Sequence, residues 1–201
     1  MDWKDIKPLK EYEARLIVKN YFLDRGFSIL DIDPRALPPG KKSPDFIIKK
    51  DDDIKGYCEV KTPANIINPI TNLYQWDTAF YKLRKFSHKA RKQFSDYDPS
   101  HTKPWIIVFT SNHPQLNWKS FFNTLMGAVI FNGKILRDFR NMDFTIKTNK
   151  DLLSIDLIMW FQINYIDRRN ICQTRYFVNK EGRFTNEIKS LLNDFRSETE
   201  K

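Results

Sequence analysis

Two acidic residues and a lysine, Asp45, Glu59 and Lys61, have the types and spacing that metal-assisted hydrolysis requires. Glu59 and Lys61 stand two positions apart in an apolar segment. Side chains of a strand alternate between its two faces, so these two share one face, and Cys58 and Val60 share the other. Buried charges are costly unless they are paired or bound to a metal. The face that carries Glu59 and Lys61 is therefore expected to meet solvent, oppositely charged partners or a bound metal.

Asp45 supplies a second carboxylate 14 positions before Glu59, a separation that suits the two arms of one hairpin. Pro44 fixes the chain ahead of Asp45 and cannot donate a ladder bond, which fits the start of a strand. Two convergent carboxylates suit a hard cation such as Mg²⁺, with water and a phosphate oxygen as further ligands. Such a metal polarises the phosphate and lowers the pKa of a bound water. Lys61 could orient that water or neutralise charge in the transition state.

The elements that must position these residues follow from the apolar periodicity. In chain order we expect a helix over 9–25 that ends at Gly26, a strand over 27–32, a hairpin of strands 45–49 and 56–61, a long helix over 75–94 and a strand over 104–110. Strand, helix and strand in that order favour a right-handed crossover between parallel strands. Further apolar segments lie at 121–130, 144–147, 155–163 and 175–178, before a closing helix over 185–195.

Two of these helices carry an apolar stripe that predicts which side faces the core. The first helix is expected to face inward through Leu9, Tyr12, Leu16, Ile17 and Leu23. The long helix is expected to face inward through Trp76, Phe80, Leu83, Ser87, Ala90 and Phe94. With no linker in view, 1–201 is interpreted as a single domain with its core at 9–110, and 111–201 is expected to complete the sheet and cover it.

The pair Pro44-Asp45, followed by Glu59-Val60-Lys61, resembles the motif of the PD-(D/E)XK nuclease superfamily. The resemblance implies an α/β fold with a central mixed β-sheet flanked by helices, a restriction-endonuclease-like core. It also implies that Asp45, Glu59 and the carbonyl of Val60 bind Mg²⁺, with Mn²⁺ as a possible substitute, and that Lys61 is catalytic. It is specific over 44–61, consistent with the order of elements over 9–110, and says little of the residues beyond.

Two more residues match positions that the family uses. Glu13 sits within the apolar stripe of the first helix, and many family members carry an acid there that reaches the metal. An ordinary glutamate at the edge of a helix is the alternative. Gln93 lies beside the inward stripe of the long helix, where several branches place a Gln or Lys that holds the scissile phosphate or the attacking water.

The chain is basic, with 34 Lys and Arg against 25 Asp and Glu and a net charge of +9. Such a surplus favours an anionic partner, and nucleic acid, DNA in particular, is expected. The long helix concentrates cations that could contact a phosphate backbone: Lys82, Arg84, Lys85, Lys89, Arg91 and Lys92. A solvated helix face is the alternative interpretation of this run.

Several classes of protein are disfavoured. Two cysteines provide neither a disulfide framework nor a CxxC cage. The first residues lack the apolar core of a signal peptide, and no run of about 18 apolar residues occurs, so we expect a cytoplasmic protein without a membrane partner.

The sequence therefore predicts a Mg²⁺-dependent nuclease. Its sequence specificity is expected to be weak, because no zinc-finger spacing, helix-turn-helix pattern or recognition helix is visible after Thr110. Two alternatives remain: a catalytically inactive nuclease-like module for nucleic-acid binding or assembly, and a structural ion-pair network. The choice between DNA and RNA, between cutting at ends and cutting internally, and between a monomer, a homo-oligomer and a complex with a partner protein stays open.

Overall fold

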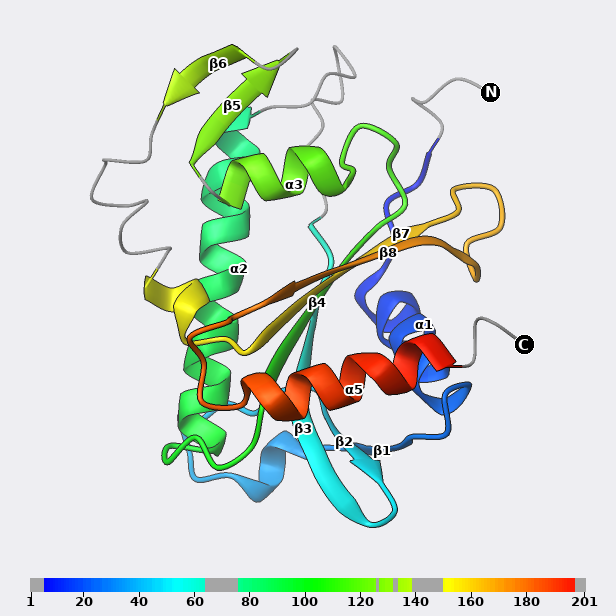
Figure 1. Cartoon of the computed structure of the whole chain (residues 1–201), viewed down its shortest axis with the longest axis vertical. Coiled ribbons are helices and arrows are strands. Elements are labelled where there is room, and N and C mark those ends of the chain that lie inside the picture. Colours follow the sequence, from blue (N-terminus) through cyan, green and yellow to red (C-terminus); the bar gives the residue numbers. More distant parts are fainter. Residues whose placement is uncertain (1–5, 64–75, 126, 132–133, 139–149, 198–201) are drawn as a thin grey trace.

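The computed structural model describes residues 6–63, 76–125, 127–131, 134–138 and 150–197 (Figure 1). Its helices are α1 (Glu11–Leu23), the 3-10 turn η2 (Pro34–Ala36), α2 (Trp76–Tyr97), α3 (Trp118–Leu125) and α5 (Thr185–Ser197). Its strands are β1 (Ser28–Asp31), β2 (Phe46–Lys50), β3 (Asp53–Lys61), β4 (Trp105–Ser111), β5 (Ala128–Phe131), β6 (Lys134–Asp138), β7 (Leu157–Ile163) and β8 (Ile171–Val178). The elements expected before residue 111 are all present, with ends shifted by a few residues. The apolar segment at 144–147 lies outside the described residues.

Within the described residues, six strands form one mixed sheet in the order β1-β2-β3-β4-β7-β8. The strands β1, β2 and β3 run antiparallel to one another, β3, β4 and β7 run parallel, and β8 is antiparallel to β7. The predicted parallel pairing across a helix is confirmed, because α2 follows β3 and precedes β4, and these two strands pair in parallel. The strands β5 and β6 form a separate hairpin.

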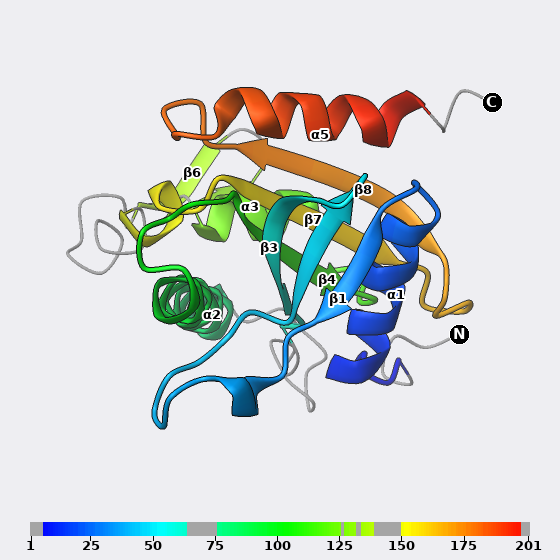
Figure 2. The same ribbon diagram turned by 90° about the horizontal axis from the view of Figure 1, so that it is seen from below.

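Helices cover both faces of this sheet, and Figure 2 shows α5 and α2 on opposite sides of it. One core lies between the sheet and the helices α1 and α5, and the other lies between the sheet and the helices α2 and α3. The two cores arise because successive strand side chains point to opposite faces and a sheet buried on both faces needs apolar residues on both. The protein is therefore an α/β protein with a mixed sheet flanked by helices, as predicted.

The predicted inward face of α1 is wrong in part. Leu9 and Ile17 are buried, but Tyr12, Leu16 and Leu23 are 65%, 56% and 49% exposed. The buried residues of α1 are instead Ala14, Ile17, Val18, Tyr21 and Phe22. Their spacing is itself helical, but it includes a small alanine and an amphipathic tyrosine. Apolar residues occur nearly all round this helix, so tertiary packing decided which stripe is buried.

The predicted inward face of α2 is confirmed where it is described, since Phe80, Leu83, Ser87, Ala90 and Phe94 are all buried. The side chain of Trp76 lies outside the described residues. Ser87 satisfies its buried hydroxyl by donating to the carbonyl of Leu83 at 3.0 Å. This well-defined packing fixes which edge of α2 faces the neighbouring strand β3.

Residues after β4 extend the sheet. Strands β7 and β8 add to its far side, and α5 packs over one face through Ile188, Leu191 and Phe195. In the described part of the chain, no helix combines the length and apolar character needed to cross a bilayer.

Candidate active site on strands β2 and β3

The antiparallel pairing of β2 with β3 brings the two predicted metal ligands together. Phe46 lies opposite Cys58 in this pairing. One step further along the same register, Asp45 comes opposite Glu59, and directly opposite residues have Cβ atoms about 4.5–5.5 Å apart. The hairpin therefore brings Asp45 and Glu59 together although they lie 14 positions apart in the sequence, as predicted.

The face of β3 that carries the charged residues looks toward α2. Cys58 and Val60 are buried in the core under α1 and α5, whereas Tyr57 belongs to the core under α2 and α3. Because strand side chains alternate, Glu59 and Lys61 share the face of Tyr57. This confirms the predicted division of the strand, and it places the two charged groups beside α2.

Asp45 is held from two sides at the start of β2. Its Oδ2 accepts a hydrogen bond from the backbone N–H of Val60 at 2.8 Å. Its Oδ1 lies 3.4 Å from the Nε of Arg15, which reaches the site from α1. The side chain of Asp45 is 12% exposed. The hydrogen bond fixes one oxygen and leaves Oδ1 as the oxygen available to a ligand.

Glu59, Lys61 and Gln93 form a chain of contacts between β3 and α2. The Nζ of Lys61 donates to the Oε1 of Glu59, and also to the Oε1 of Gln93 at 3.1 Å. The Nε2 of Gln93 donates to the carbonyl of Ser43 at 2.8 Å. Gln93 therefore lies in the site, where it joins α2 to the loop before β2. Its predicted role on the phosphate or the water stays a prediction.

The carboxyl groups of Glu59 and Asp45 are both harder to ionise than usual. Burial, followed by the charge of Asp45, raises the pKa of Glu59 to about 7, while Lys61 and a hydrogen bond with Gln93 lower it. Burial also raises the pKa of Asp45, against the opposing effects of the Val60 N–H and Arg15. Without a further cation, the protein therefore holds a proton on Glu59 up to about neutral pH.

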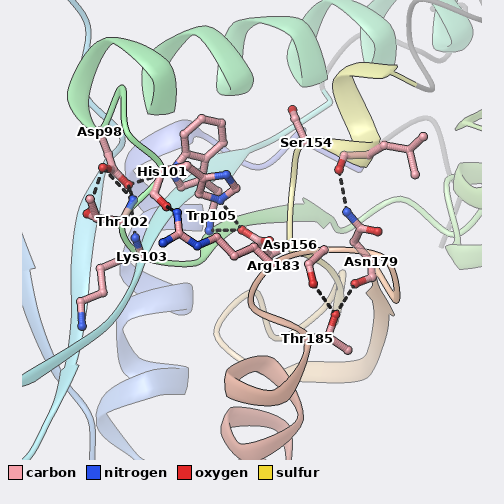
Figure 3. A network of polar contacts seen from close by, with 12 residues as sticks. Asp98, His101, Thr102, Lys103, Trp105, Ser154, Asp156, Asn179, Arg183 and Thr185 are labelled. Carbon is pink, nitrogen blue, oxygen red and sulfur yellow. Dashed lines mark hydrogen bonds and ion pairs between the residues drawn. The ribbon is translucent and has the colours of Figure 1, made fainter.

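Other buried acids of this protein have hydrogen bonds that account for them. Figure 3 shows such a network where β4 and β7 begin. There Asp156 accepts from the backbone N–H of Trp105 at 2.8 Å and contacts the Nε2 of His101 at 2.7 Å. Asp98 accepts from the N–H of Thr102 at 2.7 Å and from the indole of Trp105 at 3.2 Å. This network fastens the end of α2 to the sheet, so its acids have a structural explanation.

The hydrogen bonds of Glu59 account for it only in part, because Lys61 and Gln93 lower its pKa but leave it raised. Glu59 is only 2% exposed, and its Oε2 is buried without a hydrogen-bond partner among the described residues. An unsatisfied buried carboxylate oxygen is costly. Together with the Oδ1 of Asp45, this oxygen offers the hard, anionic ligands that Mg²⁺ prefers, so the residues present fit the metal that the resemblance implies.

The predicted metal site has only two side-chain ligands, Asp45 and Glu59. Among the described residues, no three His, Cys, Asp or Glu side chains gather closely enough to hold an ion by themselves. Mg²⁺ is commonly bound by one or two carboxylates, with waters and a substrate phosphate completing the shell. Two carboxylates match that pattern, and the part assigned to the carbonyl of Val60 stays a prediction.

Glu13 is engaged elsewhere. Its Oε2 lies 2.8 Å from the Nη2 of Arg168 and accepts from the backbone N–H of Lys10 at 2.7 Å. These contacts cap the start of α1 and join it to the turn after β7. The role of Glu13 at the metal stays a prediction, but its contacts give it a structural role.

Sequence reasoning missed two residues of α1 that act on the site. Arg15 contacts Asp45, and the charge of Glu11 helps to raise the pKa of Asp45. They lie four positions apart and so on the same face of the helix. Nothing in the sequence links this face to Asp45, because the contact depends on how α1 lies over the sheet.

The six cations of α2 differ in their surroundings. Arg91 lies 3.5 Å from the buried acid Asp151, and Lys92 pairs with Asp96 at 2.7 Å. Lys85 and Lys89 are exposed, while Lys82 and Arg84 are half-buried. Lys89 stands one turn before Gln93, on the same edge of the helix as the site. The structure thus favours Lys85 and Lys89 as contacts for an external anion.

Comparisons with protein-family models, with curated proteins and with solved structures find no match. The family resemblance of 44–61 therefore stays a prediction.

Proposed function

We propose that this protein is a Mg²⁺-dependent nuclease that hydrolyses phosphodiester bonds, with DNA as its substrate. The observation that carries the proposal is Glu59, a buried carboxylate with one oxygen lacking a partner among the described residues, next to Asp45 and Lys61. Perturbed carboxylates beside a specific charged partner are typical of functional sites.

A structural ion-pair network explains the same residues less well. A pair of Lys61 with Glu59 would account for one carboxylate oxygen of Glu59. It would leave the other oxygen unsatisfied and would gain nothing from Asp45, whose charge opposes the ionisation of Glu59. Such an arrangement destabilises the fold, so a binding role is the better reason for it.

The residues take the following parts in this proposal. Asp45, Glu59 and the carbonyl of Val60 would hold the metal, and Mg²⁺ when bound polarises the phosphate and lowers the pKa of a water. Hydrolysis joins that water oxygen to phosphorus and breaks the bond from phosphorus to the leaving oxygen. Lys61 stabilises the charge that develops on the phosphate, and Gln93 holds the Lys61 ammonium in place.

The surface beside the site suits a nucleic-acid backbone. The exposed cations Lys85 and Lys89 project from α2, and Lys89 shares the edge of Gln93. Phosphate contacts of this kind position a nucleic acid without reading its bases. They support a substrate with several phosphates rather than a small phosphate ester.

The test is cleavage by the purified chain. Linear, circular and single-stranded DNA and RNA are incubated with Mg²⁺, Mn²⁺ or EDTA. We expect metal-dependent cleavage of DNA that Lys61→Ala abolishes, while binding of metal and of DNA is largely kept, because Lys61 acts in the transition state. The matched control is Lys55→Ala, which removes a lysine of the same strand that pairs with Asp53 at 3.0 Å. This control should cleave like the wild type.

Two outcomes would contradict the proposal. DNA binding without cleavage in either metal would identify a nucleic-acid clamp instead. Equal loss of thermal stability in Lys61→Ala and Asp45→Ala, with no effect of metal on either the wild type or the variants, would identify a structural ion pair.

A further inference from the structure

Arg15 bridges a buried acid of the candidate site and an exposed acid at the end of β1. Its Nε lies 3.4 Å from the Oδ1 of Asp45, and its Nη2 lies 3.5 Å from the Oδ1 of Asp31. Lys19, one turn further along α1, pairs with the other oxygen of Asp31 at 2.7 Å. The side chain of Arg15 is 36% exposed, so it connects the site with the solvent.

The oxygen of Asp45 that faces Arg15 is the one that a metal would need. The Oδ2 of Asp45 is occupied by the N–H of Val60 at 2.8 Å, which leaves Oδ1. The contact of Oδ1 with Arg15, at 3.4 Å, is longer than the usual 2.7–3.2 Å of an N–H···O hydrogen bond. It is an ion pair that a second cation can replace without breaking a short hydrogen bond.

We infer that Arg15 is the counter-cation of Asp45 in the metal-free protein and a ligand of the substrate phosphate once the metal occupies Asp45. The inference rests on the proposed function. Two cations on one carboxylate oxygen repel each other, so the guanidinium must turn away from Oδ1 when a metal binds there. Its exposed position and its remaining N–H donors then suit a phosphate group, two oxygens of which arginine can bind through two parallel hydrogen bonds.

Asp31 is the positioning residue in this arrangement. Its Oδ1 lies 3.5 Å from the Nη2 of Arg15 outside the site, and its Oδ2 pairs with Lys19 at 2.7 Å, so it offers Arg15 a second anionic partner. Arg15 can therefore lose its contact with Asp45 and still be kept close to the bound phosphate. The substrate group is a phosphodiester next to the metal, which agrees with a nucleic-acid backbone.

The first test measures metal binding without nucleic acid. Mg²⁺ is titrated by calorimetry into the wild type, Arg15→Gln, Lys55→Gln and Asp45→Asn. Arg15→Gln should bind Mg²⁺ about tenfold more tightly, because a competing cation is removed from Asp45. Lys55→Gln removes an equal charge from β3, where Lys55 pairs with Asp53 away from the site, and should bind like the wild type. Asp45→Asn should lose the binding.

The second test measures DNA affinity with Ca²⁺ and with EDTA, since Ca²⁺ also takes oxygen ligands. Arg15→Gln should weaken DNA binding about tenfold with Ca²⁺ and leave it nearly unchanged in EDTA, where Arg15 is held by Asp45. A purely structural arginine would lower the melting temperature and alter DNA binding equally in both conditions.

The outcomes separate the inference from the proposed function. If Asp45→Asn binds Mg²⁺ like the wild type, the proposed metal site is wrong. If Asp45→Asn loses binding but Arg15→Gln binds Mg²⁺ no more tightly than Lys55→Gln, the metal site stands and the inference about Arg15 is overturned. An effect of Arg15→Gln on DNA that is the same with Ca²⁺ and EDTA would overturn it as well.

Discussion

The Oδ2 of Asp45 accepts a hydrogen bond from the backbone N–H of Val60 at 2.8 Å. This bond ties the start of β2 to the residue between Glu59 and Lys61, and it orients the carboxylate of Asp45 toward the site. Val60 is 1% exposed, so its N–H depends on this carboxylate rather than on water. The same group is thus both a structural acceptor and a candidate metal ligand, and the two roles can be separated by substitution.

Asp45→Asn and Asp45→Ala should separate these roles. Asparagine keeps an oxygen acceptor for the N–H of Val60, whereas alanine leaves this buried donor unpaired, at a cost of about 1–3 kcal/mol. We expect Asp45→Ala to be less stable than Asp45→Asn by about that amount in urea unfolding with EDTA. Both variants should lose Mg²⁺ binding. Equal stability of the two variants would show that the hydrogen bond contributes little.

Mg²⁺ affinity should rise with pH. Glu59 must be ionised to bind the metal, and its pKa is about 7 in the folded protein. Raising the pH from about 6 to about 8 should therefore strengthen binding by about tenfold. Nearly one proton should be released per bound Mg²⁺ at the lower pH and almost none at the higher pH. Calorimetry in buffers of different ionisation enthalpy measures this proton release. Affinity that is flat over this range would contradict the raised pKa.

Glu59→Gln should stabilise the metal-free protein at alkaline pH. The folded pKa of Glu59 lies above its ordinary value of 4.5, so the folded state binds the proton more tightly than the unfolded state. The contribution of Glu59 to stability is therefore fully present below about pH 4.5 and is lost as the pH rises through about 7. The full shift corresponds to about 3 kcal/mol.

Glutamine resembles the protonated acid, so the advantage of Glu59→Gln over the wild type should grow from near zero at about pH 4.5 to at most about 3 kcal/mol at pH 8. Urea unfolding across this range in EDTA measures it. A difference that does not change with pH would show that the substitution acts through packing instead.

DNA binding should depend on salt through Lys85 and Lys89. Each phosphate contact contributes about −0.9 to the slope of log affinity against log salt for duplex DNA. Replacing both lysines by glutamine should flatten the slope by roughly 2. The matched control replaces Arg91 and Lys92, which lie on the same helix but face Asp151 and Asp96. If both double variants flatten the slope equally, the basic residues of α2 act together as a diffuse positive surface, and the assignment to Lys85 and Lys89 is wrong.

Cleavage by this chain alone should show weak sequence specificity. Specific readout requires an element that places several side chains on base edges in the major groove. The exposed cations of α2 suit phosphates, which position without specifying. Sequencing the ends of products from a mixed DNA pool measures the preference, and a sharp consensus of several bases at the cut site would contradict this prediction.

The strand parity and the hairpin spacing alone were enough to predict that Asp45 and Glu59 lie on the two arms of one hairpin and that Glu59 and Lys61 share a face. These are local properties of extended chain, in which side chains alternate with a period of two. The crossover from β3 through α2 to β4 could be predicted for a similar reason, since a parallel pair needs a long connection and its handedness is fixed. The stripe of α2 followed from helical periodicity.

Tertiary structure decided what periodicity leaves open. Helix α1 is apolar on more than one side, so only its packing on the sheet selected Ala14 and Tyr21 for the core and left Leu16 exposed. The same packing brought Arg15 to Asp45 and took Glu13 to Arg168, contacts that span 30 and 155 positions of the chain. Likewise, only the fold set Arg91 against Asp151, whereas the pair of Lys92 with Asp96 lies four positions apart on α2 and follows from helical spacing. Local sequence can specify a periodic face and its i,i+4 pairs, whereas contacts such as those of Arg15 and Arg91 depend on the placement of elements that are distant along the chain.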